Sequence, residues 1–127
     1  MSSEPRRVEH VNLRQMGAGG EELAASFLEG RGFEILERNY RFGRAGEIDL
    51  IARRGNLVVF VEVKSRNTQV YGGPLYAINR RKKETLRLVA SHFLARRPEL
   101  NSRDITFRFD MIAVSGVSVE LIEDILR

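Results

Sequence analysis

Residues 47–64 read EIDLIARRGNLVVFVEVK, and this stretch decides the fold. It contains two apolar runs, Glu47–Arg53 and Leu57–Lys64, with Arg54-Gly55-Asn56 between them. A short connection of this kind between two such runs predicts a β-hairpin. The second run is apolar as far as Val63 except at Glu62, which is typical of a central strand covered on both faces.

The hairpin brings two acidic residues into register. If residues 55–56 form the turn, Asp49 lies directly opposite Glu62, and their Cβ atoms are about 5 Å apart on the same face. A turn at residues 54–55 makes the two carboxylates diagonal on that face, whereas a three-residue turn puts them on opposite faces. Two of the three turns therefore predict a pair of facing carboxylates.

A pair of facing carboxylates needs a counterion. Two like charges at that distance repel by roughly 3 kcal/mol at an effective dielectric constant of ~20. Mg²⁺ would remove this repulsion, because it binds carboxylate and carbonyl oxygens and keeps waters for a phosphate substrate. The predicted ligands are Asp49, Glu62 and the carbonyl of Val63, with Lys64 on the same face as Glu62. The alternative interpretation is a structural cluster of buried charges that holds no ion.

The first predicted helix adds a third carboxylate. Apolar residues recur at helical spacing from Leu13 to Leu28, and the glycines at 30 and 32 end the run. Glu21 borders the apolar face of this helix, so it is predicted to look into the sheet, whereas Glu22 faces water. Gly17 and Gly20 lie on the same apolar face, where they permit close approach of another segment.

The rest of the chain completes an α/β fold. The predicted elements run in the order α-β-β-β-α-β-β, which gives a mixed central β-sheet flanked by helices in a single domain over residues 1–127. Residues 1–11 are predicted to be a flexible arm. The remaining predicted elements are strands at 33–41, 105–114 and 117–122, and a helix from its N-cap Asn79 to Arg97 that Pro98 closes.

Basic residues gather near the start of the second helix. Lys82 and Lys83 fall on its apolar side, so they are predicted to overhang the sheet and, with Arg66, to bind the phosphates of a nucleic acid. A charged run is more often a solvated surface, and that interpretation stays open for Arg80–Lys83. Arg108 and Asp110 share a strand face, where a structural ion pair is the default.

Composition excludes several classes of protein. The 127 residues include no cysteine and only two histidines, which excludes disulfides, thiolate zinc sites and cysteine nucleophiles and argues against a serine–histidine hydrolase. No run approaches the ~18 apolar residues of a spanning helix, and residues 1–14 lack a secretory signal. We therefore expect a cytoplasmic protein without a membrane partner. The net charge of +4 permits a polyanionic partner.

The ordered motifs resemble a known family. They are Gly17-x-x-Gly20-Glu21-x-x-Ala24, Gly46-Glu47-Ile48-Asp49-Leu50-Ile51, Phe60-Val61-Glu62-Val63-Lys64-Ser65-Arg66, Tyr71-Gly72, Lys82 and Arg108-Phe109-Asp110. The two central motifs resemble the PD-(D/E)XK nuclease superfamily, although Ile48 stands where the superfamily's name has proline. The whole set resembles the YraN-like family of small bacterial proteins, described as endonuclease-like and similar to archaeal Holliday junction resolvases.

The resemblance implies a restriction-endonuclease-like fold and a Mg²⁺- or Mn²⁺-dependent endonuclease that hydrolyses DNA, with branched DNA as a candidate substrate. By the motif match, Asp49 and Glu62 bind the metal and Lys64 orients or activates the attacking water. Glu21 matches the acidic residue that these folds often contribute from the first helix. Because resolvases of this fold are dimers, a homodimer is also implied.

Two interpretations compete with an enzyme. One is a non-catalytic nucleic-acid-binding or adaptor protein that keeps the nuclease fold, and the other is a structural partner in a larger assembly. The intact set of Asp49, Glu62 and Lys64 favours the enzyme over both, because loss of any member would have favoured the others.

Overall fold

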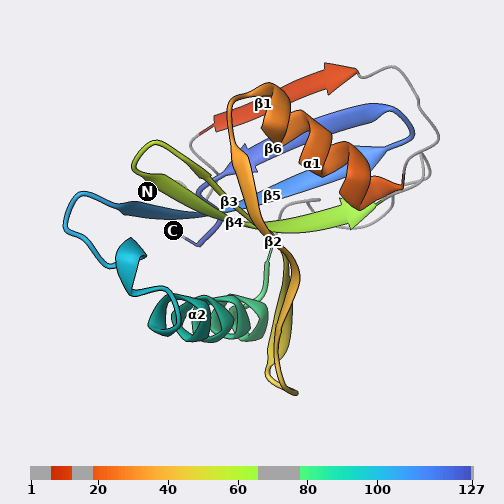
Figure 1. The fold of residues 1–127 in the computed structure, drawn as a ribbon. Helices are drawn as coiled ribbons and strands as arrows, with labels where there is room; N and C mark the ends of the chain where they lie inside the picture. The colour runs from red at the N-terminus through yellow and green to blue at the C-terminus, as the bar shows by residue number, and fades with distance from the viewer. Residues whose placement is uncertain (1–6, 13–18, 66–77, 127) are drawn as a thin grey trace.

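The computed structural model describes residues 7–12, 19–65 and 78–126. Its six strands form one mixed sheet in the order β1-β6-β5-β4-β3-β2 (Figure 1). The elements are β1 (Arg7–Asn12), α1 (Gly20–Gly30), β2 (Glu34–Phe42), β3 (Gly46–Arg54), β4 (Leu57–Ser65), α2 (Arg80–Ala95), the 3₁₀ turn η1 (Pro98–Leu100), β5 (Thr106–Ser115) and β6 (Ser118–Glu123).

The sheet combines an antiparallel meander with one parallel crossover. β2, β3 and β4 pair antiparallel in sequence order, and β5 pairs parallel to β4 after the chain has passed through α2. β6 then returns antiparallel beside β5. The predicted α/β class, mixed sheet and element order are confirmed, with one additional strand before α1.

That additional strand lies in the predicted flexible arm. Arg7–Asn12 pairs antiparallel with β6, with Arg7 opposite Glu123 and Asn12 opposite Ser118. The prediction of a flexible arm over residues 1–11 is therefore wrong for residues 7–11, and residues 1–6 lie outside the described part of the chain. The strand forms because it pairs with the edge of β6. The local sequence pattern of the arm does not indicate this distant partner, so the strand was not predicted.

The two helices cover opposite faces of the sheet (Figure 1). α1 buries Leu23, Ala24, Phe27 and Leu28 against one face, and α2 buries Leu86, Val89 and Phe93 against the other. Alternate residues of β4 enter the two apolar clusters, as predicted for a strand covered on both sides. Neither helix is long and apolar enough to cross a membrane, within the ranges that the structure describes.

The hairpin register follows the first of the three predicted turns. Arg54 pairs with Leu57 and Leu50 pairs with Val61, so Gly55 and Asn56 form the connection. Gly55 adopts a φ of +59°, a left-handed conformation that glycine reaches at no steric cost. The paired register ends at Leu50 and Val61, so the predicted placement of Asp49 directly opposite Glu62 is not formed, and Asp49 instead reaches the end of β4 through a side-chain hydrogen bond to the backbone of Val63.

Two glycines allow helices to approach the same end of β4. A Cβ atom on Gly20 would collide with the Ser65 hydroxyl, which confirms the predicted close approach at the first turn of α1. Gly46 has a φ of +151°, and a Cβ atom there would collide with the Thr85 side chain of α2. The start of α1 and the start of β3 are thus held against β4 and α2 respectively. Gly17 lies outside the described residues.

Candidate active site

Four segments meet at the carboxyl end of β4. The backbone of β4 hydrogen-bonds to Asp49 of β3, Ser65 packs against Gly20 of α1, and Glu62 pairs with Lys82 of α2. We call Glu21, Glu47, Asp49, Glu62, Lys64 and Lys82 the β4-end cluster. Both helices contribute residues of their first turns, so their electropositive N-terminal ends lie near this cluster.

Asp49 is half-buried at the start of β3. Its Oδ2 atom accepts a hydrogen bond of 2.8 Å from the backbone N–H of Val63. The pKa of Asp49 is raised from 3.8 to about 6, chiefly by burial and in smaller part by the negative charges of Glu62, Glu21 and Glu47, against the lowering effect of the Val63 bond. The surroundings of Asp49 therefore disfavour its charged form, a condition that a bound cation would reverse.

Glu62 is the buried acid of the cluster. Its side chain is 8% exposed, and its Oε2 atom lies 3.2 Å from Lys82 Nζ and 3.8 Å from Lys64 Nζ. The two lysine side chains are 39% and 51% exposed respectively, so each ammonium group reaches the carboxylate from the solvent side. These two positive charges offset the cost of burying the carboxylate.

Three carboxylates of the cluster are close enough to share an ion. Glu21, Glu47 and Asp49 are all half-buried, and each offers an oxygen atom such that the three lie within 4.8 Å of one another. The predicted approach of Glu21 from the first helix thus agrees with the structure. Glu62 is not part of this three-acid group.

Glu47 is the member that sequence analysis missed. It precedes Asp49 by two residues on β3, so strand alternation places both on one side, and this spacing is the signal that could have found it. Glu47 Oε1 also accepts a hydrogen bond of 2.9 Å from Arg41 Nη2 of β2, across the strand pair. Glu47 therefore couples the acidic group to the β2–β3 hairpin.

The other predicted site residues are Val63, Lys83 and Arg66. The backbone N–H of Val63 donates a hydrogen bond to Asp49, and the Val63 side chain packs on the α1 side of the core. The role of the Val63 carbonyl as a metal ligand stays a prediction. Lys83 is half-buried in the first turn of α2 beside Lys82. Arg66 lies outside the described residues, as do Tyr71 and Gly72 of the sequence motif. Asn79 caps α2 as predicted, its side chain accepting a 2.8 Å bond from the Lys82 N–H.

A second buried acid lies outside the cluster. Asp110 of β5 is 1% exposed and accepts hydrogen bonds from the Nε and Nη2 atoms of Arg108 at 2.9 to 3.2 Å. The backbone N–H of Asp124 donates to the same carboxylate, and Arg108 also pairs with Glu123 at 3.3 Å. The predicted structural ion pair is confirmed.

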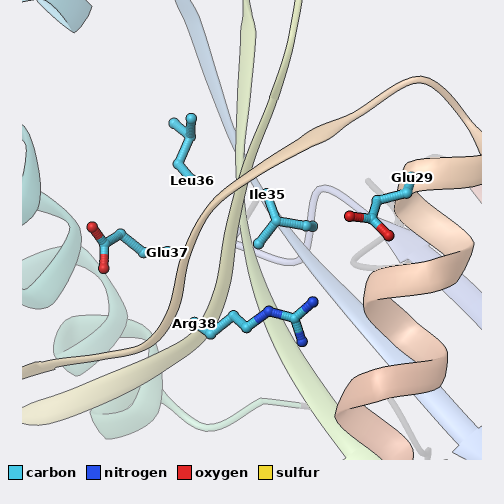
Figure 2. A pocket seen from close by; sticks show the side chains of 5 residues that line it. All are labelled: Glu29, Ile35, Leu36, Glu37 and Arg38. Carbon is cyan, nitrogen blue, oxygen red and sulfur yellow. The ribbon is translucent and has the colours of Figure 1, made fainter.

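The surface hollow in Figure 2 is a separate feature. It lies beside β2, where Ile35 and Glu37 flank a β-bulge, and its other lining residues are Glu29, Leu36 and Arg38. Ile35 and Arg38 extend toward α1, which carries Glu29, whereas Leu36 and Glu37 extend to the other side of the strand. No member of the β4-end cluster lines this hollow.

Comparison with known proteins gives the family of the chain. Residues 20–114 match the uncharacterised protein family UPF0102. A UPF0102 protein of Halorhodospira halophila is 43% identical over 114 residues, which is 90% of this chain and 88% of the relative. Others from Caldicellulosiruptor saccharolyticus and Symbiobacterium thermophilum are 42% and 46% identical over 82% and 80% of this chain, and 85% and 82% of those relatives. The chain belongs to the UPF0102 family, which confirms the YraN-like resemblance.

Proposed function

We propose that this member of the UPF0102 family is a metal-dependent endonuclease that hydrolyses DNA phosphodiester bonds in the cytoplasm, with branched DNA as its candidate substrate. The observation that carries this function is the β4-end cluster: an acid on β3, an acid and a lysine on β4, and an acid from α1 meet at one strand end. This is the arrangement that the PD-(D/E)XK resemblance requires of Asp49, Glu62, Lys64 and Glu21.

Mg²⁺ or Mn²⁺ fits the donor set. The proposed ligands are Asp49, Glu62 and the Val63 carbonyl, and Glu21 and Glu47 lie beside Asp49. All of these donors are oxygen atoms, which hard cations prefer. Burial, and in smaller part the neighbouring carboxylates, raise the pKa of Asp49, and such an ion would stabilise the charged form that these surroundings disfavour. When bound, the ion supplies Lewis-acid polarisation of a phosphate and of the water that attacks it.

Lys64 is the proposed catalytic lysine. Its ammonium group lies 3.8 Å from Glu62 Oε2, and half of its side chain is exposed to a substrate. From that position Lys64 orients the attacking water and stabilises the negative charge that develops on the phosphate in the transition state. Strand alternation keeps Lys64 on the same side of β4 as Glu62, so its ammonium group stays near a phosphate that the ion would hold.

The proposed partner is DNA, and we propose that a homodimer of the chain binds it. Lys82 and Lys83 lie in the first turn of α2, where the helix dipole favours an anion, and the basic run begins at Arg80. Arg66, which directly follows β4 in the sequence and lies outside the described residues, is a further proposed phosphate contact. Phosphate contacts by these residues would hold the backbone across the β4-end cluster without reading its sequence.

A binding or adaptor protein is the second candidate. The observation that favours it is the pairing of Glu62 with two lysines, because a carboxylate already neutralised by ammonium groups does not need a metal. On this interpretation the cluster stabilises the end of the sheet, and the basic surface alone binds nucleic acid.

Cleavage assays separate the two functions. Purified protein with Mn²⁺ is incubated with four-way junction, forked, single-stranded and plain duplex DNA. We expect the wild-type protein to cut at least one of these, and Lys64→Ala to cut it about 100- to 1,000-fold more slowly, as for loss of one transition-state donor, with DNA affinity retained. Lys83→Ala, in the same basic region but outside the cluster, is the control and should keep the cleavage rate at saturating DNA. Equal cleavage by wild type and Lys64→Ala, or none by either, would overturn the endonuclease.

A further inference from the structure

We propose that Lys82 is a displaceable counterion: in the metal-free protein its ammonium group neutralises Glu62, and metal binding releases it to a DNA phosphate. Lys82 is thereby a positioning residue that couples occupancy of the metal site to DNA affinity. This inference rests on the proposed metal site and goes beyond it, since sequence analysis placed Lys82 on DNA phosphates alone.

The geometry gives Lys82 the closer position. Lys82 Nζ lies 3.2 Å from Glu62 Oε2, and Lys64 Nζ lies 3.8 Å from the same oxygen atom. Two ammonium groups therefore share one carboxylate oxygen. Lys64 is two residues beyond Glu62 on the same strand, whereas Lys82 comes from a different element, so its pairing is set by how α2 packs on the sheet.

The backbone at both ends of this pair is fixed. The Lys82 N–H donates to the Asn79 side chain at 2.8 Å, which anchors the first turn of α2. Glu62 belongs to a central strand paired on both sides and is only 8% exposed. The Lys82 side chain is 39% exposed, and its four-carbon stem rotates freely. The lysine is therefore the partner that can leave.

A divalent ion and the Lys82 ammonium group compete for Glu62. An ion shared by Asp49 and Glu62 would sit within a few ångströms of any cation on Oε2, and two positive charges so close in a half-buried place repel strongly. Metal binding therefore requires that Lys82 move away from Glu62. The metal-free pairing lowers the apparent metal affinity, because part of the binding free energy is spent in displacing the lysine.

The released ammonium group remains in a useful place. It stays attached to the first turn of α2, beside Lys83, at a helix end whose dipole favours an anion. A DNA phosphate is the partner that this position and charge suit. Because binding free energies are reciprocal, metal then raises DNA affinity and DNA raises metal affinity by the same factor.

Titration calorimetry with Mn²⁺ in the absence of DNA tests the displacement. Lys82→Met removes the competing charge and keeps the apolar stem, and Lys83→Met is the matched control one residue away. We expect Lys82→Met to bind Mn²⁺ about 10-fold more tightly than wild type, within the usual range of such couplings. Lys83→Met should bind as wild type does, and Lys82→Arg, which restores a positive charge, should bind close to wild type.

The second readout is the salt dependence of DNA affinity. It is measured with and without Mg²⁺ in the cleavage-deficient Lys64→Ala background. With Mg²⁺ the slope of log affinity against log salt should steepen by about 0.9, one phosphate contact, and this gain should vanish in Lys82→Met.

The outcomes separate the two proposals. Equal or weaker Mn²⁺ binding by Lys82→Met would overturn the counterion role and leave the metal site standing. Absence of Mn²⁺ binding by wild type and variant alike would overturn both. Tighter binding by Lys82→Met together with no DNA cleavage by the wild type would support the counterion role and overturn the endonuclease.

Discussion

Two neighbouring parallel strands each bury one carboxylate, and they neutralise it in different ways. Asp110 of β5 receives a two-pronged pair of hydrogen bonds from one guanidinium group and a third bond from a backbone N–H. Glu62 of β4 receives two ammonium groups at 3.2 and 3.8 Å, both on a single oxygen atom. The register pairs Val61 with Asp110, so the two acids point to opposite faces of the sheet.

The difference separates a structural acid from the acid that we propose to be reactive. Arg108 is planar and its hydrogen bonds to Asp110 are directional, so that pair leaves little room for another ligand. The lysines at Glu62 are compact charges on flexible stems, and both come from the solvent side. Such partners can be exchanged for a metal ion or a phosphate. Both acids are buried, so burial does not distinguish them, whereas the kind of partner does.

The largest expected effect concerns the stability of these two pairs. Asp110→Asn removes one charge of a buried pair and should lower the free energy of unfolding by about 3 kcal/mol, since the Arg108 guanidinium then lacks its main carboxylate. Glu62→Gln should lower it by less than about 1 kcal/mol, because Lys64 and Lys82 can turn to water. Urea denaturation in metal-free buffer measures both. A cost for Glu62→Gln as large as that for Asp110→Asn would break the comparison.

The next effect is the pH dependence that Asp49 confers. Its pKa is raised from 3.8 to about 6 in the folded protein, so the native state favours the protonated carboxyl. The stability it contributes is present below pH 3.8 and is lost as the pH rises through 6. In metal-free buffer, Asp49→Asn should match wild type near pH 4 and melt at a higher temperature at pH 8.

Thermal melts between pH 4 and 8 measure this difference, and Mn²⁺ provides the complementary arm. At pH 8 the ion should raise the melting temperature of wild type and leave that of Asp49→Asn nearly unchanged, because selective binding to the native state is stabilising. Glu22→Gln, an acid of α1 that faces water beside Glu21, is the control and should behave as wild type in both buffers. A melting temperature that is higher at pH 8 than at pH 5 in metal-free wild type would contradict the assignment.

Most of the fold could be predicted because its signals are local. The two apolar runs of β3 and β4 predicted the hairpin from the sequence, and the structure selects the turn at residues 55–56 from the three that the sequence left open. The helical spacing in α1 places Glu21 at the border of its packed face. The pairing of β1 with β6 is a contact between segments far apart in the sequence, and no local pattern in residues 7–12 predicts it.

The partners within the cluster were harder to predict. Helical periodicity places Lys82 on the side of α2 that faces the sheet, but only the packing of α2 decides that its ammonium group meets Glu62. Glu47 could have been found from its two-residue spacing from Asp49. Its partner Arg41 could not, because only the pairing of β2 with β3 brings Arg41 Nη2 within 2.9 Å of Glu47 Oε1. The partners of charged side chains near a strand end thus depend on tertiary packing, which sequence periodicity does not encode.

The smallest expected effect sharpens the comparison through DNA binding. We propose that the cations around Glu62 exchange, whereas the Arg108 guanidinium is held by Asp110 and Glu123. In Mg²⁺-containing buffer and in the Lys64→Ala background, Lys82→Ala should reduce the slope of log affinity against log salt by about 0.9, the value for one lost phosphate contact. Arg108→Lys, which keeps the charge but loses the two-pronged geometry, should leave that slope unchanged while lowering the urea midpoint. Fluorescence anisotropy with a labelled junction between 50 and 200 mM salt, a range over which phosphate contacts dominate affinity, measures both slopes. An equal change in slope for the two variants would mean that the Arg108 side of the sheet also faces DNA, and the division between a structural and an exchangeable charge pair would fail.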